Sequence, residues 1–300
     1  MEKRQLAYLG APSEVGACLK GAGLAPQALR DDGFLEDLEK AGVSIEDKGD
    51  IEGPLFFKKE QNTDLHFLQE NIVWSKLILK ALRKCYKEDK VPLLIGGDHA
   101  VSMGSIAAAK EEANKNGRPL HILWFDAHGD FNIPETSPTG HIHGMPLAVV
   151  CGKGRKELLE TLSFNNSPVL GKNIMLVGAR DIDEGESILL KNSDIQQISM
   201  EKIKKKGLIF YVDAALKKAQ ADGAHLHVSF DVDVLDSREL PATGTPVEEG
   251  ISIKEMAQAF KVIKDSKKMD SLDVVELNPL LDHKNEAVKK IKKLVEMLFI

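Results

Sequence analysis

The sequence predicts one α/β domain over residues 1–300, with a doubly wound, mostly parallel sheet and helices on both faces. Short apolar segments alternate along the chain with longer segments of helical periodicity. Strands that alternate with helices form a parallel sheet whose two faces are covered. No Pro/Ser-rich linker, fixed-period repeat or low-complexity tract divides the chain, and 43% hydrophobic residues suffice for a large core. A single domain is therefore expected.

Compact apolar runs are the predicted strands. The first lies near the amino terminus, and the others are spaced so that a helix fits between most neighbours. In chain order the predicted strands are Gln5–Leu9, Val91–Ile95, His121–Phe125, Asn173–Val177, His225–Phe230 and Ser271–Val275.

Apolar residues that recur at helical spacing predict the helices. The longest runs from Thr63 to Tyr86, where leucine and isoleucine side chains would form one buried stripe. The residues of that stripe are Leu68, Ile72, Leu79 and Leu82. The remaining predicted helices are Val101–Asn114, Arg155–Leu162, Gly207–Gln220, Ile253–Ser266 and Asn285–Leu298.

Composition argues against several classes of function. The 40 Lys and Arg against 46 Asp and Glu give a net charge of −6, which does not support nucleic acid or an anionic membrane as partner. The lysine clusters Lys202–Lys206 and Lys289–Lys293 fit solvated helix faces, because Ile and Leu flank them at helical spacing. The cysteines Cys18, Cys85 and Cys151 form no CxxC pair, so no disulfide framework is expected. With no apolar run near ~20 residues and no leader-like start, a cytoplasmic protein is expected.

Polar residues that directly follow a predicted strand are the candidate site residues, because ligands bind at the carboxyl ends of strands in such sheets. His99 follows Gly96-Gly97-Asp98 and is by itself a weak signal, since a lone histidine there is more often structural. A far stronger signal comes from Asp126, His128 and Asp130. They would share one face if the extended geometry of the preceding strand continues.

Asp231 and Asp233 repeat this pattern after the strand that ends at Phe230. With Asp126 and Asp130 they bring four carboxylates to one region, which is costly to desolvate without cations. Two divalent cations would cancel that charge, so a dinuclear metal site is inferred. A ligand set of nitrogen and oxygen suits Mn²⁺, and ligand type alone also permits Zn²⁺, Co²⁺, Ni²⁺ or Fe²⁺.

Glu276 ends the last predicted strand, and Pro279 blocks further regular pairing. Near a metal centre this carboxylate could bind a cationic group of a substrate. It could equally make a structural hydrogen bond, and the sequence leaves both interpretations open.

These four blocks, in this order, resemble the ureohydrolase family of arginases, agmatinases and formiminoglutamases. The resemblance runs from about Gly96 to His283, and the loop from Asp126 to Gly144 is most similar to bacterial arginases. It implies an arginase-like fold and hydrolysis of L-arginine to L-ornithine and urea by a hydroxide bridging two Mn²⁺ ions per subunit. The implied metal ligands are His99, Asp126, His128, Asp130, Asp231 and Asp233, with Asp126 and Asp231 bridging.

The resemblance also implies how the substrate is held. Side chains of the loop after Asp130 would recognise the α-carboxylate, and acids after Arg180 the α-ammonium. Thr245 would support Glu276 in binding the guanidinium. The implied substrate contacts are Asn132, Ser137, Thr139, His141, Asp183, Glu186 and Thr245.

Three residues are implied in catalysis: Asp130, His143 and Glu276. Asp130 would take a proton from the attacking hydroxide, and His143 would protonate the leaving amine, for which its ordinary pKa of ~6.5 is suited. His141 lies only two residues away, so one of these two histidines could instead be structural.

Several alternatives stay open. His141 stands where arginases usually carry Asn, so another guanidino substrate such as agmatine or formiminoglutamate is the nearest rival. A catalytically silent relative that serves as a regulatory or binding subunit is a second, although all six implied ligands are present. A nucleotide-binding protein is disfavoured, because no GxGxxG or GxxxxGK[ST] motif follows the first strand. By family analogy the chain would form a homo-oligomer, a trimer or hexamer.

Overall fold

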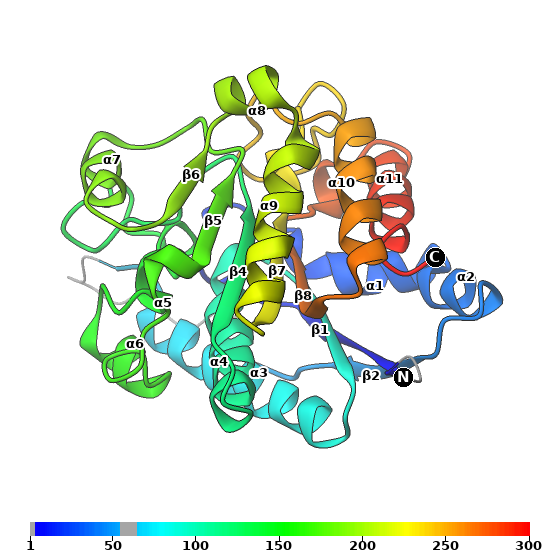
Figure 1. The fold of residues 1–300 in the computed structure, drawn as a ribbon, viewed down its shortest axis with the longest axis horizontal. Coiled ribbons are helices and arrows are strands. Elements are labelled where there is room, and N and C mark those ends of the chain that lie inside the picture. The colour runs from blue at the N-terminus through cyan, green and yellow to red at the C-terminus, as the bar shows by residue number, and fades with distance from the viewer. Residues whose placement is uncertain (1–3, 55–64) are drawn as a thin grey trace.

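A parallel sheet forms the centre of the molecule. The computed structural model describes residues 4–54 and 65–300, and within these ranges eight strands join one sheet in the order β2-β1-β3-β8-β7-β4-β5-β6 (Figure 1). Every neighbouring pair runs parallel. The predicted α/β class is confirmed.

The predicted strands are confirmed, with small shifts at their ends. The strands are β1 (Leu6–Ala11), β2 (Ile45–Asp50), β3 (Val91–Gly96), β4 (Leu120–Phe125), β5 (Ile174–Val177), β6 (Gln196–Ile198), β7 (His225–Asp231) and β8 (Met269–Val275). Strands β2 and β6 were not predicted. They form the two edges of the sheet, where pairing with β1 and β5 rather than side-chain burial holds their polar sequences.

The helices follow the predicted positions for the longer segments. They are α1 (Ala25–Asp31), α2 (Phe34–Lys40), α3 (Leu68–Lys87), α4 (Ser102–Lys115), α5 (Pro146–Val150), α6 (Lys156–Thr161), α7 (Glu184–Lys191), α8 (Met200–Lys206), α9 (Leu208–Ala221), α10 (Ile253–Ser266) and α11 (Glu286–Glu296). The helix predicted from Thr63 begins only at Leu68, and residues 63 and 64 lie outside the described residues. Its predicted stripe is buried. Helices α1, α2, α5 and α7, each of at most eight residues, were not predicted, and α8 was expected only as the helix face that carries the Lys202–Lys206 cluster.

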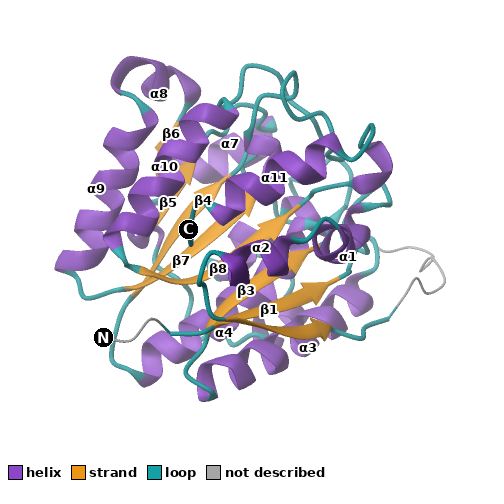
Figure 2. Cartoon of the chain, turned by 90° about the vertical axis from the view of Figure 1, so that its right-hand side faces the viewer, coloured by secondary structure: helices purple, strands orange, loops and turns teal. Residues whose placement is uncertain are grey.

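Helices cover both faces of the sheet, as Figure 2 shows. On one face α1, α2, α9, α10 and α11 pack in a core that includes Phe125, Phe230 and Phe260. On the other face α3 to α6 pack in a core that includes Ile78 and Trp124. No helix within the described ranges is long and apolar enough to cross a membrane.

The central strands β3, β8, β7 and β4 are neighbours, although the chain visits them far apart in sequence. Their carboxyl ends point to the same edge of the sheet, because all four run parallel. His99, Glu276, Asp231 and Asp126 each follow or end one of these strands. Chain segments nearly two hundred residues apart therefore meet at one place.

Candidate active site and metal centre

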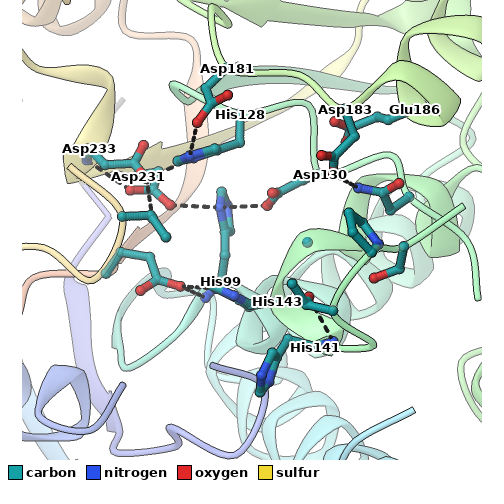
Figure 3. A pocket seen from close by; sticks show the side chains of 17 residues that line it. His99, His128, Asp130, His141, His143, Asp181, Asp183, Glu186, Asp231 and Asp233 are labelled. Carbon is teal, nitrogen blue, oxygen red and sulfur yellow. Dashed lines mark hydrogen bonds and ion pairs between the residues drawn. The ribbon is translucent and has the colours of Figure 1, made fainter. Parts of the chain in front are cut away.

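A cavity of about 260 Å³ lies at the carboxyl ends of these central strands (Figure 3). Its size is close to the lower end of the ~300–1,000 Å³ that small-molecule sites usually enclose. The cavity is lined by His99, His128, Asp130, Asn132, Ser137, Pro138, Thr139, His141, His143, Gly144, Asp181, Asp183, Glu186, Asp231, Asp233, Thr245 and Glu276. The structure thus brings together every predicted site residue. Asp126 alone among them does not line the cavity, and it is fully buried against His99 and His128.

The inner group consists of His99, Asp126, Asp130 and Asp231. The Nδ1 atom of His99 lies 3.1 Å from an oxygen of Asp126 and 3.0 Å from oxygens of Asp130 and of Asp231. Neither His99 Nδ1 nor Asp130 Oδ2 has a hydrogen-bond partner, although both atoms are buried. One ring nitrogen cannot donate to three carboxylates, so a cation among these atoms fits their arrangement.

The outer group consists of Asp126, His128 and Asp233. The Nδ1 atom of His128 lies 3.0 Å from Asp233 Oδ2 and 3.5 Å from Asp126 Oδ1. Asp126 presents its other oxygen, Oδ2, to the inner group, so its carboxylate is shared by both groups. The donor set of imidazole nitrogen and carboxylate oxygen is the chemistry of a first-row divalent metal site.

Proton affinities in the inner group show how much charge is concentrated there. Burial and the neighbouring Asp126 raise the pKa of Asp130 to about 8. Burial alone would lower the pKa of His99, but the surrounding carboxylates raise it well above its ordinary value. Carboxylates at this density retain protons unless a cation replaces them, so metal binding here would release protons.

Glu276, which is buried, and His143, which is half-buried, form a pair beside the inner group. The Oε1 atom of Glu276 accepts a hydrogen bond from the backbone N–H of His99 at 2.9 Å and lies 3.1 Å from His143 Nδ1. Burial disfavours the charged ring of His143, but Glu276 outweighs it and raises the pKa of His143 to about 9. This pair provides an anionic acceptor and an adjacent proton donor at the cavity wall.

Two site residues have strained backbones. Asp130 has φ 49° and Glu276 has φ 64°, in the left-handed region that non-glycine residues seldom adopt. Such strain persists only where the surrounding structure enforces it, and it clusters at functional sites. Here it turns both carboxylates toward the cavity at the points where the chain leaves β4 and β8.

The outer part of the cavity carries the predicted substrate contacts. The side-chain amide of Asn132 donates to Asp183 Oδ2 at 3.0 Å. The hydroxyls of Ser137 and Thr139 each accept one backbone N–H, which leaves their protons free to donate. Thr245 donates to Asp233 Oδ2 at 3.1 Å and so links the cavity wall to the outer group.

Glu186 comes close to the loop that follows β4. Its carboxylate accepts a hydrogen bond from the backbone N–H of Phe131 at 2.7 Å. A Cβ at Gly129 would lie 2.6 Å from that carboxylate, so only glycine permits the approach. Burial raises the pKa of Glu186 to about 7.

Sequence reasoning missed two residues of the site. Trp124 stacks on His99, with ring centroids 4.3 Å apart, and its indole N–H donates to Asp126 Oδ2 at 2.9 Å. Its position two residues before Asp126, on the same face of β4, was the available signal. Asp181 lies 3.8 Å from His128 Nε2 at the exposed rim, and its place directly after Arg180, two residues before Asp183, was the available signal.

Comparison with known proteins shows the family to which the chain belongs. The sequence profile described as "Arginase family" matches residues 4–300. An arginase of Staphylococcus aureus (strain MRSA252) is 37% identical over 305 residues, which cover 99% of this chain and 98% of the relative. The chain belongs to the arginase family.

Solved structures of family members share the fold. A crystal structure of arginase from Bacillus subtilis is 33% identical with a TM-score of 0.88, covering 99% of this chain and 98% of that one. Arginase from Entamoeba histolytica in complex with L-ornithine is 32% identical with a TM-score of 0.90, covering 100% and 99%. As an arginase-family member, the chain is a hydrolase that acts on a guanidino group.

Proposed function

We propose that this chain hydrolyses L-arginine to L-ornithine and urea with two Mn²⁺ ions bound in the cavity. The observation that carries the proposal is the pair of His/Asp groups that share Asp126 at the floor of a substrate-sized cavity. The Entamoeba arginase that this chain resembles was crystallised with L-ornithine, the expected product.

The residues present fit the two ions. His99 and Asp130 would hold one ion and His128 and Asp233 the other. Asp126 and Asp231 would join the two, and Asp126 already offers one oxygen to each group. When bound, two such ions lower the pKa of a water from 15.7 toward ~7 and so supply hydroxide at neutral pH.

The chain's own residues then hold the substrate and move protons. Glu276 is buried, anionic and directed into the cavity, so it can bind the guanidinium. Hydrolysis breaks the bond between the guanidinium carbon and the nitrogen that leaves with ornithine, and that nitrogen must gain a proton. His143 carries a proton at neutral pH because of Glu276, so it is placed to supply one.

The outer cavity distinguishes arginine from agmatine, which lacks the α-carboxylate. Asn132, Ser137 and Thr139 present an amide and two hydroxyls for that carboxylate. Asp183 provides an anionic group for the α-ammonium, and Glu186 lies beside it in the same cavity. We therefore expect a higher kcat/KM for arginine than for agmatine. The advantage comes from hydrogen-bond donors that would stay unpaired with agmatine.

One observation favours a second candidate, hydrolysis of another guanidino compound. His141 lines the cavity, and its ring packs against His66 with centroids 4.6 Å apart. Burial, followed by the charges of His143 and His66, lowers the pKa of His141 to about 4. The ring is therefore neutral at pH 7 and offers a carboxylate a hydrogen bond but no positive charge.

A substrate panel on the manganese-loaded protein tests both candidates. Arginine, agmatine and formiminoglutamate are assayed side by side, with urea and formamide release measured separately. Urea from arginine at the highest kcat/KM supports the proposal. Preference for agmatine, or formamide release from formiminoglutamate, would assign the second candidate instead.

A further inference from the structure

We propose that Asp273 is a positioning residue that, through the hydroxyl of Ser229, fixes the ring of His99 for metal binding. Asp273 contacts none of the six proposed metal ligands directly. The proposal deepens the metal site and rests on the proposed function.

Strands β7 and β8 carry an unusual polar stripe between them. Strands buried on both faces of a parallel sheet are normally apolar. Here His227 pairs in register with Ser271, and Ser229 with Asp273. All four side chains are buried, Ser229, His227 and Asp273 with 0% of their surface exposed. Such groups destabilise a core unless every one is paired, so their arrangement requires an explanation.

The hydrogen bond between Ser229 and Asp273 has only one possible direction. As a carboxylate, Asp273 can only accept hydrogen bonds. Burial alone would raise its pKa, but His227, His99 and Ser229 together outweigh burial and lower it. Ser229 donates to Asp273 Oδ1 at 2.5 Å, and His227 Nε2 lies 2.9 Å from Asp273 Oδ2. The hydroxyl proton of Ser229 is therefore committed to Asp273.

Because Ser229 donates its proton to Asp273, the nitrogen of His99 that faces Ser229 must carry a proton. Ser229 Oγ lies 2.9 Å from His99 Nε2 and can only accept there, so His99 Nε2 must be the donor. When metal binding displaces the other ring proton, Nε2 keeps its own, and the lone pair of Nδ1 faces the place among Asp126, Asp130 and Asp231 where the ion would bind. A hydrogen bond to the second ring nitrogen is the usual means of fixing a histidine ligand.

The other contacts of the ring cannot replace this effect. Trp124 stacks on His99 with an angle of 16° between the rings, which fixes the ring plane but does not distinguish the two nitrogens. In the outer group, His128 Nε2 lies 3.8 Å from Asp181, whose side chain is 70% exposed. The effect of Asp273 should therefore be confined to the ion of the inner group.

Metal binding by Ser229→Ala and Asp273→Asn tests the proposal. Affinity for Mn²⁺ is measured by competition with a chelator, and stoichiometry by metal analysis. We expect each variant to lose ~10–100-fold in affinity for one ion and to keep wild-type affinity for the other. Two ions bound with wild-type affinity in both variants would overturn the proposal.

A double-mutant cycle asks whether Asp273 acts through Ser229. If it does, the variant carrying both substitutions loses no more affinity than Ser229→Ala alone. Additive losses would mean that Asp273 acts by another route and would refute this assignment. Ser229→Thr, which keeps the hydroxyl, should retain most of the affinity, so the test stands even if Asp273→Asn does not fold.

His225→Gln is the matched control. His225 is a buried histidine of the same strand, but it lies near Tyr86 and Ser271 at the amino-terminal end of β7 and makes no hydrogen bond with His99. This variant should bind both ions as the wild type does, and an equal loss of affinity would contradict the proposal.

The results also separate this inference from the proposed function. If the wild type binds two ions and hydrolyses arginine, but the Ser229 and Asp273 variants are unaffected, only this inference fails. A wild type without bound metal defeats the proposed function as well.

Discussion

Both ends of the parallel sheet bury ionisable groups, but they treat them differently. At the amino end, Asp270 accepts hydrogen bonds from Arg4 and Arg118 at 2.9 Å and from the backbone N–H of Leu226 at 3.1 Å. At the carboxyl end, His99 Nδ1 and Asp130 Oδ2 are buried without any hydrogen-bond partner. The first arrangement is complete in itself, whereas the proposed metal ions would complete the second.

The difference shows that buried charge alone does not indicate a site. Ion-pair networks that only stabilise the fold also perturb pKa values. What distinguishes the carboxyl end is that unpaired acceptors from separate strands face one cavity. Substitutions at the two ends should therefore change different properties, metal binding and catalysis at one and stability at the other.

Asp126→Asn should have the largest effect. The two groups share this carboxylate, so the variant should lose both ions and urea release from arginine should fall to the detection limit. Metal analysis and the urea assay measure this. Asp270→Asn, a matched change at the amino end, should retain both ions and activity. Activity in an Asp126→Asn protein that binds no metal would contradict the account.

His143→Ala should lower kcat by ~10²–10⁴, the range for loss of general acid–base catalysis. His143 contacts Glu276 but belongs to neither metal group, so metal content should not change. Steady-state kinetics and metal analysis on the same preparation measure both properties. An unchanged kcat would remove the proton-transfer role from this histidine.

Asp270→Asn should reduce the free energy of unfolding by ~1–3 kcal/mol, because Arg118 and the N–H of Leu226 lose a charged acceptor. Chemical denaturation of the metal-free protein gives this value. The comparison between the two ends of the sheet fails if Asp270→Asn leaves the free energy of unfolding unchanged but lowers the affinity for metal.

The smallest effect concerns pH. Burial lowers the pKa of His225 to about 4, so the folded chain keeps this ring neutral while the unfolded chain protonates it near pH ~6.5. This contribution to stability is complete above pH ~6.5. It decreases as the pH falls toward 4, by at most about 1.4 kcal/mol per pH unit. Between pH 7 and pH 5, the free energy of unfolding should decrease less for His225→Gln than for the wild type. An equal decrease in both proteins would contradict the lowered pKa of His225.

The sequence predicted which histidines and aspartates meet at the carboxyl end of the sheet, for a physical reason. Asp126, His128 and Asp130 directly follow a buried strand, so their place at its carboxyl end was predictable. The expected continuation of the extended geometry is not found, because β4 ends at Phe125 and Asp130 has φ 49°. The convergence with Asp231 and Asp233 followed from the parallel sheet, whose strand ends meet at one edge. The family resemblance added the substrate loop.

The remaining features depended on tertiary contacts. Strands β2 and β6 form because edge backbone pairs with β1 and β5, which the polar side chains of these strands do not reveal. Ser229 and Asp273 read as ordinary polar positions in strands until the register of β7 and β8 places them side by side. Their role depends on pairing across the sheet, which no local sequence pattern indicates.

Titration of Mn²⁺ into the metal-stripped protein, scored by urea release from arginine, tests the central claim most directly. The account predicts no urea without metal and an activity that rises to a plateau at two ions per chain. Full activity in the stripped protein, or a plateau reached with a single ion, would contradict it.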